Sequence, residues 1–237
     1  KADRAANWQK DDRVKNFQWG SSLYQAANSN FDKGHMTKRE DVQWGNSEFE
    51  AQQAADSTFF YPNAVPQHKN LNQVVWANLE DYILHSEAVK RSLKICVFTG
   101  PVLLKDDPEF ITKIKDEKVQ IPVHFWKIVY FIKELNTIHK VGFIMSQKEL
   151  LSKEGTIINK NTASIKDPFS SYKSSETYQV KVSAIEKITS IQFPKGEEVY
   201  TKDKSIPLIY KETEIKPKNK IELYPNSKTF KIQNLIL

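Results

Sequence analysis

Apolar residues form long runs in the middle of the chain that are typical of β-strands. The first run covers Ser92–Thr99, and the second covers Val123–Ile132, which is rich in aromatic and β-branched side chains. Residues Lys140–Met145 have the same character, and Leu135–Thr137 can supply a turn before them. We therefore expect the second and third runs to pair as antiparallel neighbours.

A helical period governs residues Leu71–Lys90. Apolar side chains recur there every three or four residues, at Leu71, Val75, Leu79, Tyr82 and Ile83. Asn70, just before the period begins, is a suitable N-cap. We expect a second, short helix around Gln147–Lys153, and a strand that continues into a helix over Tyr178–Ile188.

The order of these elements indicates the fold class. A shorter strand-like run, Thr58–Tyr61, ends at the chain-breaking pair Pro62-Asn63. Strands and helices do not alternate regularly, as they would in a parallel α/β fold. The pattern therefore favours an α+β fold, with a central antiparallel sheet flanked by helices.

The length and composition suggest one main domain with an appendage. The chain has 237 residues, and after Phe193-Pro194 it becomes lysine-rich, with strand-like pieces at Pro207–Tyr210 and Lys220–Tyr224. We divide it into a main domain, residues 1–194, and a C-terminal extension of unknown role, residues 195–237. The lysines of the extension are interpreted as a solvated face, with auxiliary nucleic-acid contact as the alternative.

Cysteine content and apolar run lengths limit the class of protein further. The single cysteine, Cys96, cannot form an internal disulfide, and its place in the apolar run Ile95–Phe98 predicts a buried, inert thiol. No stretch approaches the roughly 20 apolar residues of a membrane span, so we expect no membrane partner. Because the chain opens at Lys1 without a signal-like core, we expect that an upstream signal peptide, domain or propeptide has been removed.

The charge balance is compatible with a polyanionic partner. The formal net charge is +6 and the sequence pI is near 9.1. A cationic surface attracts phosphate and releases condensed counterions. Many basic proteins never bind nucleic acid, so charge alone does not identify the partner.

Candidate chemistry is concentrated in residues 31–80. His35 follows Gly34, and a neutral histidine suits the role of a general base while the glycine permits a tight turn or a close approach. Asn72, Trp76 and Glu80 are four residues apart, which places them on one side of a helix. Mg²⁺ takes oxygen ligands and keeps several waters, so Asn72 can be its one direct protein ligand while Glu80 orients the waters.

These residues belong to an ordered set of motifs. The set comprises Asp32–His35, Asn63–Gln67, Leu71–Gln73, Trp76 and Leu79-Glu80. It resembles the DNA/RNA non-specific endonucleases, the endonuclease G-like family with a ββα-metal (His-Me finger) site. Their pattern reads Asp-Arg-Gly-His, then Asn-x-x-Pro-Gln, then Leu-Asn-Gln followed by a tryptophan and Leu-Glu. The resemblance covers roughly residues 3–193 and implies the ββα-metal fold.

The resemblance also implies roles for individual residues. It makes His35 the general base and Asn72 the magnesium ligand, with Asn63 and Glu80 supporting the base and the metal waters. Arg4, ahead of an aromatic residue and an aspartate, resembles the arginine that stabilises charge on the phosphate, although Arg13 competes for this role. Lys33 stands where the family has arginine, and it keeps the charge but loses the bidentate fork.

The activity implied by the resemblance is hydrolysis of DNA and RNA phosphodiester bonds, leaving 5′-phosphate ends. The implied cofactor is Mg²⁺, with Mn²⁺ as a substitute. The implied partners are DNA and RNA, bound through their phosphates, and the resemblance leaves room for a homodimer or an inhibitor protein. It also leads us to expect a secreted or periplasmic location.

Two other functions were weighed against this one. The first is a catalytically silent nucleic-acid-binding or toxin-associated module on the same fold, suggested by Lys33 and by the loose match at Arg4. The second, a zinc hydrolase, has no support, because the sequence has no His-Glu-x-x-His motif and no Cys/His cluster at ligand spacing. We expect Asp32 to brace the strand end, and the other histidines to be ordinary surface or core residues: His68, His85, His124 and His139.

Overall fold

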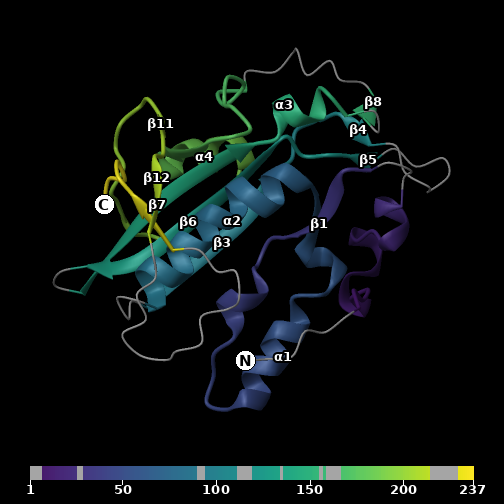
Figure 1. The fold of residues 1–237 in the computed structure, drawn as a ribbon, viewed down its shortest axis with the longest axis horizontal. Coiled ribbons are helices and arrows are strands. Elements are labelled where there is room, and N and C mark those ends of the chain that lie inside the picture. The colour runs from purple at the N-terminus through teal and green to yellow at the C-terminus, as the bar shows by residue number, and fades with distance from the viewer. Residues whose placement is uncertain are drawn as a thin grey trace. The chain divides into compact units, whose positions relative to one another are not determined.

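The computed structural model, drawn in Figure 1, comprises two compact units. The first unit comprises Lys1–Asn72, Leu103–Val123 and Gln147–Lys166, and the second comprises Gln73–Val102, His124–Ser146 and Asp167–Leu237. The structure describes residues 7–25, 29–89, 94–110, 119–133, 136–154, 157–158, 167–213 and 229–237.

The first unit is built around a two-stranded ribbon. Strand β1 (Phe31–His35) pairs antiparallel with β2 (Ala64–His68), and the register places His35 opposite Ala64. A two-stranded ribbon alone is marginally stable, so it needs packing from other elements. A cluster of buried side chains supplies that packing: Leu23, Phe31, Val119, Ile121, Val123 and Leu151.

Short elements surround the ribbon in the first unit. The helix α1 (Glu48–Ser57) begins at Ser47, whose hydroxyl accepts the N–H of Glu50 as an N-cap. A small antiparallel sheet has the order β5 (Val119–Gln120), β4 (Glu109–Phe110), β8 (Ile157–Ile158). The remaining elements are η1 (Asp12–Phe17), η2 (Ser21–Tyr24), η3 (Arg39–Val42), η4 (Tyr61–Asn63) and α3 (Lys148–Leu151).

A helical segment begins at Leu71 and runs through three consecutive elements. These are η5 (Leu71–Trp76) and η6 (Tyr82–Val89), both with π-type hydrogen bonding, and α2 (Ala77–Asp81) between them. Two strands followed by a helix, β1, β2 and this segment, are the chain order of a ββα motif. The helix predicted over Leu71–Lys90 is confirmed as far as Val89, and Lys90 lies outside the described residues.

The second unit is dominated by a six-stranded sheet. The order is β11 (Ile206–Pro207), β9 (Thr177–Val180), β7 (Thr137–Ser146), β6 (His124–Lys133), β3 (Ile95–Val102), and β10 (Glu197–Glu198) joins β7 in parallel. The other pairings are antiparallel. The long strands β6 and β7 lie side by side (Figure 1). Their fully buried side chains, including Phe125, Ile128, Ile144 and Met145, form much of the core.

The end of the chain adds strands to this second unit. Both β10 and β11 lie beyond residue 194 and pair with strands of the main sheet, while β12 (Tyr210–Thr213) pairs with β13 (Thr229–Ile232). The helix α4 (Val182–Thr189) packs against β7. The domain boundary between residues 194 and 195 stays a prediction, and the predicted strand Lys220–Tyr224 lies outside the described residues.

The α+β fold with an antiparallel sheet is confirmed, and so are its main strands. The turn between β6 and β7 passes through Asn136, whose φ of 61° lies in the left-handed region that asparagine tolerates. Within the described residues, no helix combines the length and the apolar character needed to cross a lipid bilayer.

Two expectations from the apolar pattern are wrong. Residues Thr58–Tyr61 form a turn and the start of η4, and their aromatic side chains, Phe59 and Tyr61, are buried; the run signals burial, and the strand begins only at Ala64. Cys96 is exposed, because β3 is the edge strand of its sheet and its first half is open on one face.

Candidate active site

His35 is the last residue of β1, and aromatic rings hold its imidazole in place. The ring centroid of Trp8 lies 4.6 Å from that of His35, and the ring of Phe59 meets it edge-on at 5.0 Å. The backbone around Gln9 fixes this arrangement, because its N–H donates to the carbonyl of Phe59 and its carbonyl accepts the N–H of Tyr61. A histidine restrained in this way keeps one orientation without a covalent or metal tether.

Gly34 is required by the close approach of Gln67. A Cβ atom added at Gly34 would lie 2.0 Å from the Gln67 Oε1 atom, so the buried Gln67 side chain would have to move. Gln67 is fully buried, and neither polar atom of its amide has a hydrogen-bond partner among the described residues. Burying an unpaired amide costs free energy, so this group is available to bind water or another polar ligand. The sequence motif contains Gln67, but the pattern alone assigned it no role.

Asn72 is oriented by Asp32. Its Nδ2 donates to Asp32 Oδ2 at 2.9 Å, which fixes the amide plane and leaves Oδ1 as the acceptor. A carbonyl oxygen is the kind of ligand that Mg²⁺ prefers, so the donor set at Asn72 fits the implied ion. Asp32 thus contacts the side chain of Asn72, and its expected role in bracing the strand end stays a prediction.

Asn63 braces the segment that follows His35. Its Oδ1 accepts the N–H of Thr37 at 2.8 Å, and its Nδ2 donates to the carbonyls of Thr37 and Thr58 at 3.0 and 2.9 Å. The carbonyl of Asn63 also accepts the N–H of Met36 at 3.0 Å. These bonds engage both ends of the amide, so Asn63 fixes the backbone that follows His35.

Lys33 lies beside an aromatic ring. Its ammonium nitrogen is 5.9 Å from the centroid of the Tyr24 ring, within the range of a cation–π interaction. Burial raises the pKa of the Tyr24 phenol, and the neighbouring Tyr61 adds to the rise, so the ring beneath Lys33 stays neutral. The contact gives Lys33 a defined place on the ribbon.

The arginine candidates differ in what can be described. Arg4 lies outside the described residues. Arg13 forms an ion pair with Asp11, with 2.6 Å between Nη2 and Oδ2, although its side chain is 81% exposed. The hydrogen bonds from Arg13 lower the pKa of Asp11. Arg13 is therefore already engaged by a carboxylate.

Glu80 belongs to the second unit, where it contacts a buried lysine. The Lys127 ammonium lies 3.4 Å from Glu80 Oε1 and donates to Thr99 Oγ1 at 3.0 Å. It also lies 4.7 Å from the centre of the Trp76 ring. Lys127 is 1% exposed and Glu80 is 8% exposed, so each charge stabilises the other in a poorly solvated place. The sequence pattern did not single out Lys127.

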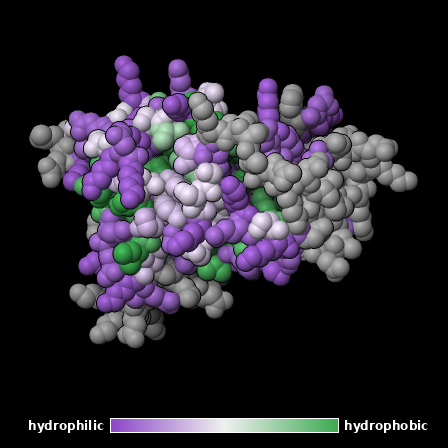
Figure 2. All heavy atoms as spheres, turned by 90° about the horizontal axis from the view of Figure 1, so that it is seen from above, coloured by the Kyte–Doolittle hydropathy of each residue, from purple (hydrophilic) through white to green (hydrophobic). Residues whose placement is uncertain are grey.

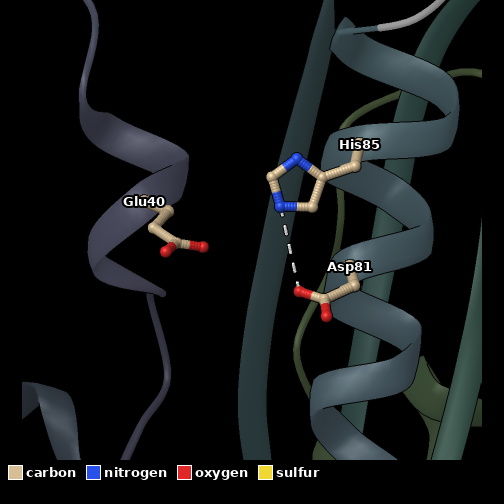
Figure 3. Close-up of side chains that lie close together, drawn as sticks. All are labelled: Glu40, Asp81 and His85. Atoms are coloured by element: carbon tan, nitrogen blue, oxygen red, sulfur yellow. Dashed lines mark ion pairs between the residues drawn. The ribbon is translucent and has the colours of Figure 1, made fainter. Parts of the chain in front are cut away.

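Each of the four other histidines lies beside a carboxylate. His85 Nε2 is 4.0 Å from Asp81 Oδ1, one helical turn earlier (Figure 3). The pairs His124–Asp167, His68–Glu154 and His139–Glu197 are separated by 2.8, 3.1 and 3.6 Å. Three of the histidines, His68, His85 and His124, are buried.

The surface agrees with the polar composition. Figure 2 shows hydrophilic residues over most of the described surface on the face drawn, with apolar residues in small separate patches. Scattered apolar residues of this kind are ordinary on protein surfaces. The exposed ones include Trp44 and Phe49, which are 76% and 70% exposed.

Known proteins resemble this chain in sequence. Human mitochondrial endonuclease G is 34% identical over 108 residues, covering 43% of this chain and 33% of the human protein. The mitochondrial nuclease of Saccharomyces cerevisiae is 28% identical over 137 residues, covering 54% and 39%. An uncharacterized protein of Sinorhizobium fredii, y4fB, is 30% identical over 149 residues, covering 60% and 21%. The chain therefore spans between 21% and 39% of the length of these relatives.

A solved structure resembles the fold. It is a crystal structure of EndoG in complex with EndoGI, and it matches with a TM-score of 0.50 and 22% identity over 81% of this chain and 70% of that one. The family model for DNA/RNA non-specific endonucleases matches residues 1–199, which is most of the chain. The chain therefore belongs to the DNA/RNA non-specific endonuclease family.

Proposed function

We propose that this chain is a metal-dependent endonuclease that hydrolyses DNA and RNA with little sequence preference. One observation carries the proposal: β1 ends in His35, packed against the Trp8 and Phe59 rings, and the same strand orients the amide of Asn72 through Asp32. Membership of the nuclease family supports it. A histidine at the end of β1 and an amide oxygen in η5 that the same strand orients support the proposal.

His35 acts as the general base. Its neutral imidazole takes a proton from a water molecule, which attacks the phosphorus atom in line. Because the nucleophile comes from solvent, the reaction does not use the 2′-hydroxyl of the sugar. The same site can therefore cut both DNA and RNA.

Asn72 Oδ1 would hold the metal ion, and a role of Glu80 on the metal waters stays a prediction from the sequence. When bound, Mg²⁺ supplies stabilisation of the negative charge on the phosphate and on the departing 3′ oxygen. Departure of the 3′ oxygen gives 5′-phosphate ends. Mn²⁺ shares the preference for oxygen ligands and should replace Mg²⁺.

Substrate recognition in this proposal is through the phosphate backbone. Lys33 and Arg4 contribute positive charge to it, and contacts of this kind carry no sequence information. Affinity should therefore fall with salt concentration and vary little with sequence. Because the related EndoG structure is a complex with EndoGI that concerns EndoG inhibition, we extend the proposal to an inhibitor protein as a partner.

Digestion of supercoiled plasmid and of ribosomal RNA tests the proposal. We expect both to be degraded with Mg²⁺, neither with EDTA, and a gel-shift assay in EDTA to detect binding of intact DNA. Intact nucleic acid under all conditions, from folded protein that still binds DNA, would establish the silent binding module instead. Cleavage confined to one short recognition sequence would contradict recognition through phosphates.

A further inference from the structure

The side chain of Gln147 forms hydrogen bonds with the backbone of β2. Gln147 is fully buried, its Oε1 accepts the backbone N–H of His68 at 2.8 Å, and its Nε2 donates to the carbonyl of Pro66 at 3.3 Å. The same Nε2 donates to the carbonyl of Pro122 at 2.6 Å. The Gln147 amide thus pairs a backbone N–H and a backbone carbonyl of β2, as a neighbouring strand would.

His68, at the end of β2, uses both nitrogens of its ring. Nδ1 accepts the backbone N–H of Asn70 at 3.2 Å, so the ring proton is on Nε2. That nitrogen faces Glu154 Oε1 at 3.1 Å and donates to it. His68 is 4% exposed and Glu154 is 7% exposed, so the pair is shielded from solvent.

Asn30 also links the segment of residues 68–70 to the carboxylate of Glu154. The side chain of Asn30 donates to Glu154 Oε1 at 2.9 Å, and its carbonyl accepts the N–H of Lys69 at 2.8 Å. Glu154 is itself fixed at the end of α3, where its N–H donates to the carbonyl of Leu151. Residues 68–70 are therefore held by one buried carboxylate through two independent routes.

The segment of residues 68–70 leads directly to Asn72, the residue that would bind the metal. Asn70, whose N–H His68 accepts, lies two positions before Asn72, whose amide Asp32 orients. Ligands must hold their position to within about 0.5 Å for a site to work. The position of residues 68–70 therefore bears directly on the position of Asn72 Oδ1.

We propose that His68, anchored by Glu154, is a positioning residue that fixes the Asn72 amide for metal binding. The inference rests on the proposed function, because it assumes that Asn72 is the ligand. His68 does not touch the substrate, since both ring nitrogens are occupied and the ring is buried. We call the group of Asn30, His68, Gln147 and Glu154 the turn clamp.

Two substitutions separate the two contacts of the His68 ring. In His68→Asn the side-chain oxygen can replace Nδ1 as acceptor, but the contact with Glu154 is lost. In His68→Gln the amide nitrogen can replace Nε2 as donor, but the acceptor for Asn70 is lost. Glu154→Gln keeps an acceptor oxygen for both His68 and Asn30 and serves as the conservative variant. His139→Gln, at a histidine of the second unit, is the matched control.

The readout is Mn²⁺ affinity, measured by calorimetry in a His35→Ala background so that catalysis plays no part. We expect His68→Asn and His68→Gln each to weaken binding about 10–100-fold, with unchanged far-UV circular dichroism. We expect Glu154→Gln and His139→Gln to stay close to the parent protein. If both His68 variants lose Mn²⁺ binding only together with their far-UV circular dichroism signal, His68 supports the fold alone and the positioning role is wrong.

Asn72→Ala separates the failure of this inference from the failure of the proposed function. If Asn72→Ala abolishes Mn²⁺ binding while both His68 variants keep the parent affinity, the positioning role is wrong and the metal site stands. If Asn72→Ala also binds normally, the proposed metal site is wrong, and the positioning role is wrong with it.

Discussion

The ribbon of the first unit relies more on buried polar contacts than the sheet of the second unit, which relies on long strand pairing and apolar burial. Strands β6 and β7 are ten residues long, pair along their whole length, and bury side chains such as Phe125 and Ile144 completely. The ribbon strands are five residues long, and buried amides and a carboxylate from distant segments hold the ribbon in addition to the apolar cluster around Phe31. The proposed base and metal ligand are on the ribbon side of this comparison.

This difference predicts where activity and stability separate. Apolar burial contributes roughly 25 cal/mol per Å², so long, well-packed strands carry much of the folding free energy. Hydrogen bonds contribute less on average, but they fix direction. Substitutions in the ribbon should therefore lower activity more than stability, and substitutions in the sheet should do the reverse.

Replacement of His35 by alanine should produce the largest loss of activity. We expect cleavage of plasmid to fall about 10²–10⁴-fold, because a general base contributes that much. The melting temperature should fall by only a few degrees, since His35 is half-buried at the end of its strand. His139→Ala is the control and should retain nearly full activity; equal losses in the two variants would argue against His35 as the base.

Replacement of Lys127 by methionine should produce the largest loss of stability. The change leaves Glu80 buried without its lysine, and breaking a buried ion pair costs roughly 3–5 kcal/mol. Urea unfolding measures the free energy, with Lys133→Met, at an exposed position of the same strand, as the control. Adding Glu80→Gln should recover part of the loss, and no recovery would mean that the pair is not coupled.

Gly34→Ala should disturb the ribbon to a smaller extent. The new Cβ would overlap the side chain of Gln67, and overpacking of this kind costs about 1–3 kcal/mol. Activity and melting temperature should both fall, and Gln67→Ala in the same protein should relieve the clash. Gly20→Ala is the matched control, because its Cβ meets only the flexible end of Lys10 at 3.1 Å.

The smallest effect is expected at Cys96. The exposed thiol should react with a soluble disulfide reagent in the native protein, at a rate close to that of a free cysteine. Cys96→Ser should change the free energy of unfolding by less than about 0.5 kcal/mol. A thiol that reacts only after denaturation would show that the edge of β3 is covered.

The elements of the sheet were predictable because local patterns encode them. The runs Val123–Ile132 and Lys140–Met145 contain few polar residues and many aromatic and β-branched ones. The helix after Leu71 has apolar residues every three or four positions. Prediction from apolar runs was wrong where an apolar residue is not a buried residue of a strand. Thr58–Tyr61 is apolar because its rings are buried in a turn, and Cys96 sits in an apolar run on an open edge.

The candidate site was predictable only in part. The motif containing His35 and Asn72 is compact in sequence, so resemblance to a family was enough to select both. The residues that hold the site are far away along the chain: Gln147 and Glu154 are 79 and 86 residues from His68. No local period links such residues, and glutamine and glutamate are common at surfaces, so only the fold reveals that they are buried beside the ribbon.

Chemical rescue of His35→Ala by imidazole tests the account most directly. Removal of the ring deletes the group that packs against Trp8 and Phe59, and a free imidazole can take its place beside these rings. We expect added imidazole to restore plasmid cleavage by His35→Ala in Mg²⁺, at a rate that rises with the concentration of neutral imidazole. We expect no cleavage in EDTA. A folded His35→Ala protein that cleaves as fast as wild type without imidazole would contradict the assignment of His35 as the base.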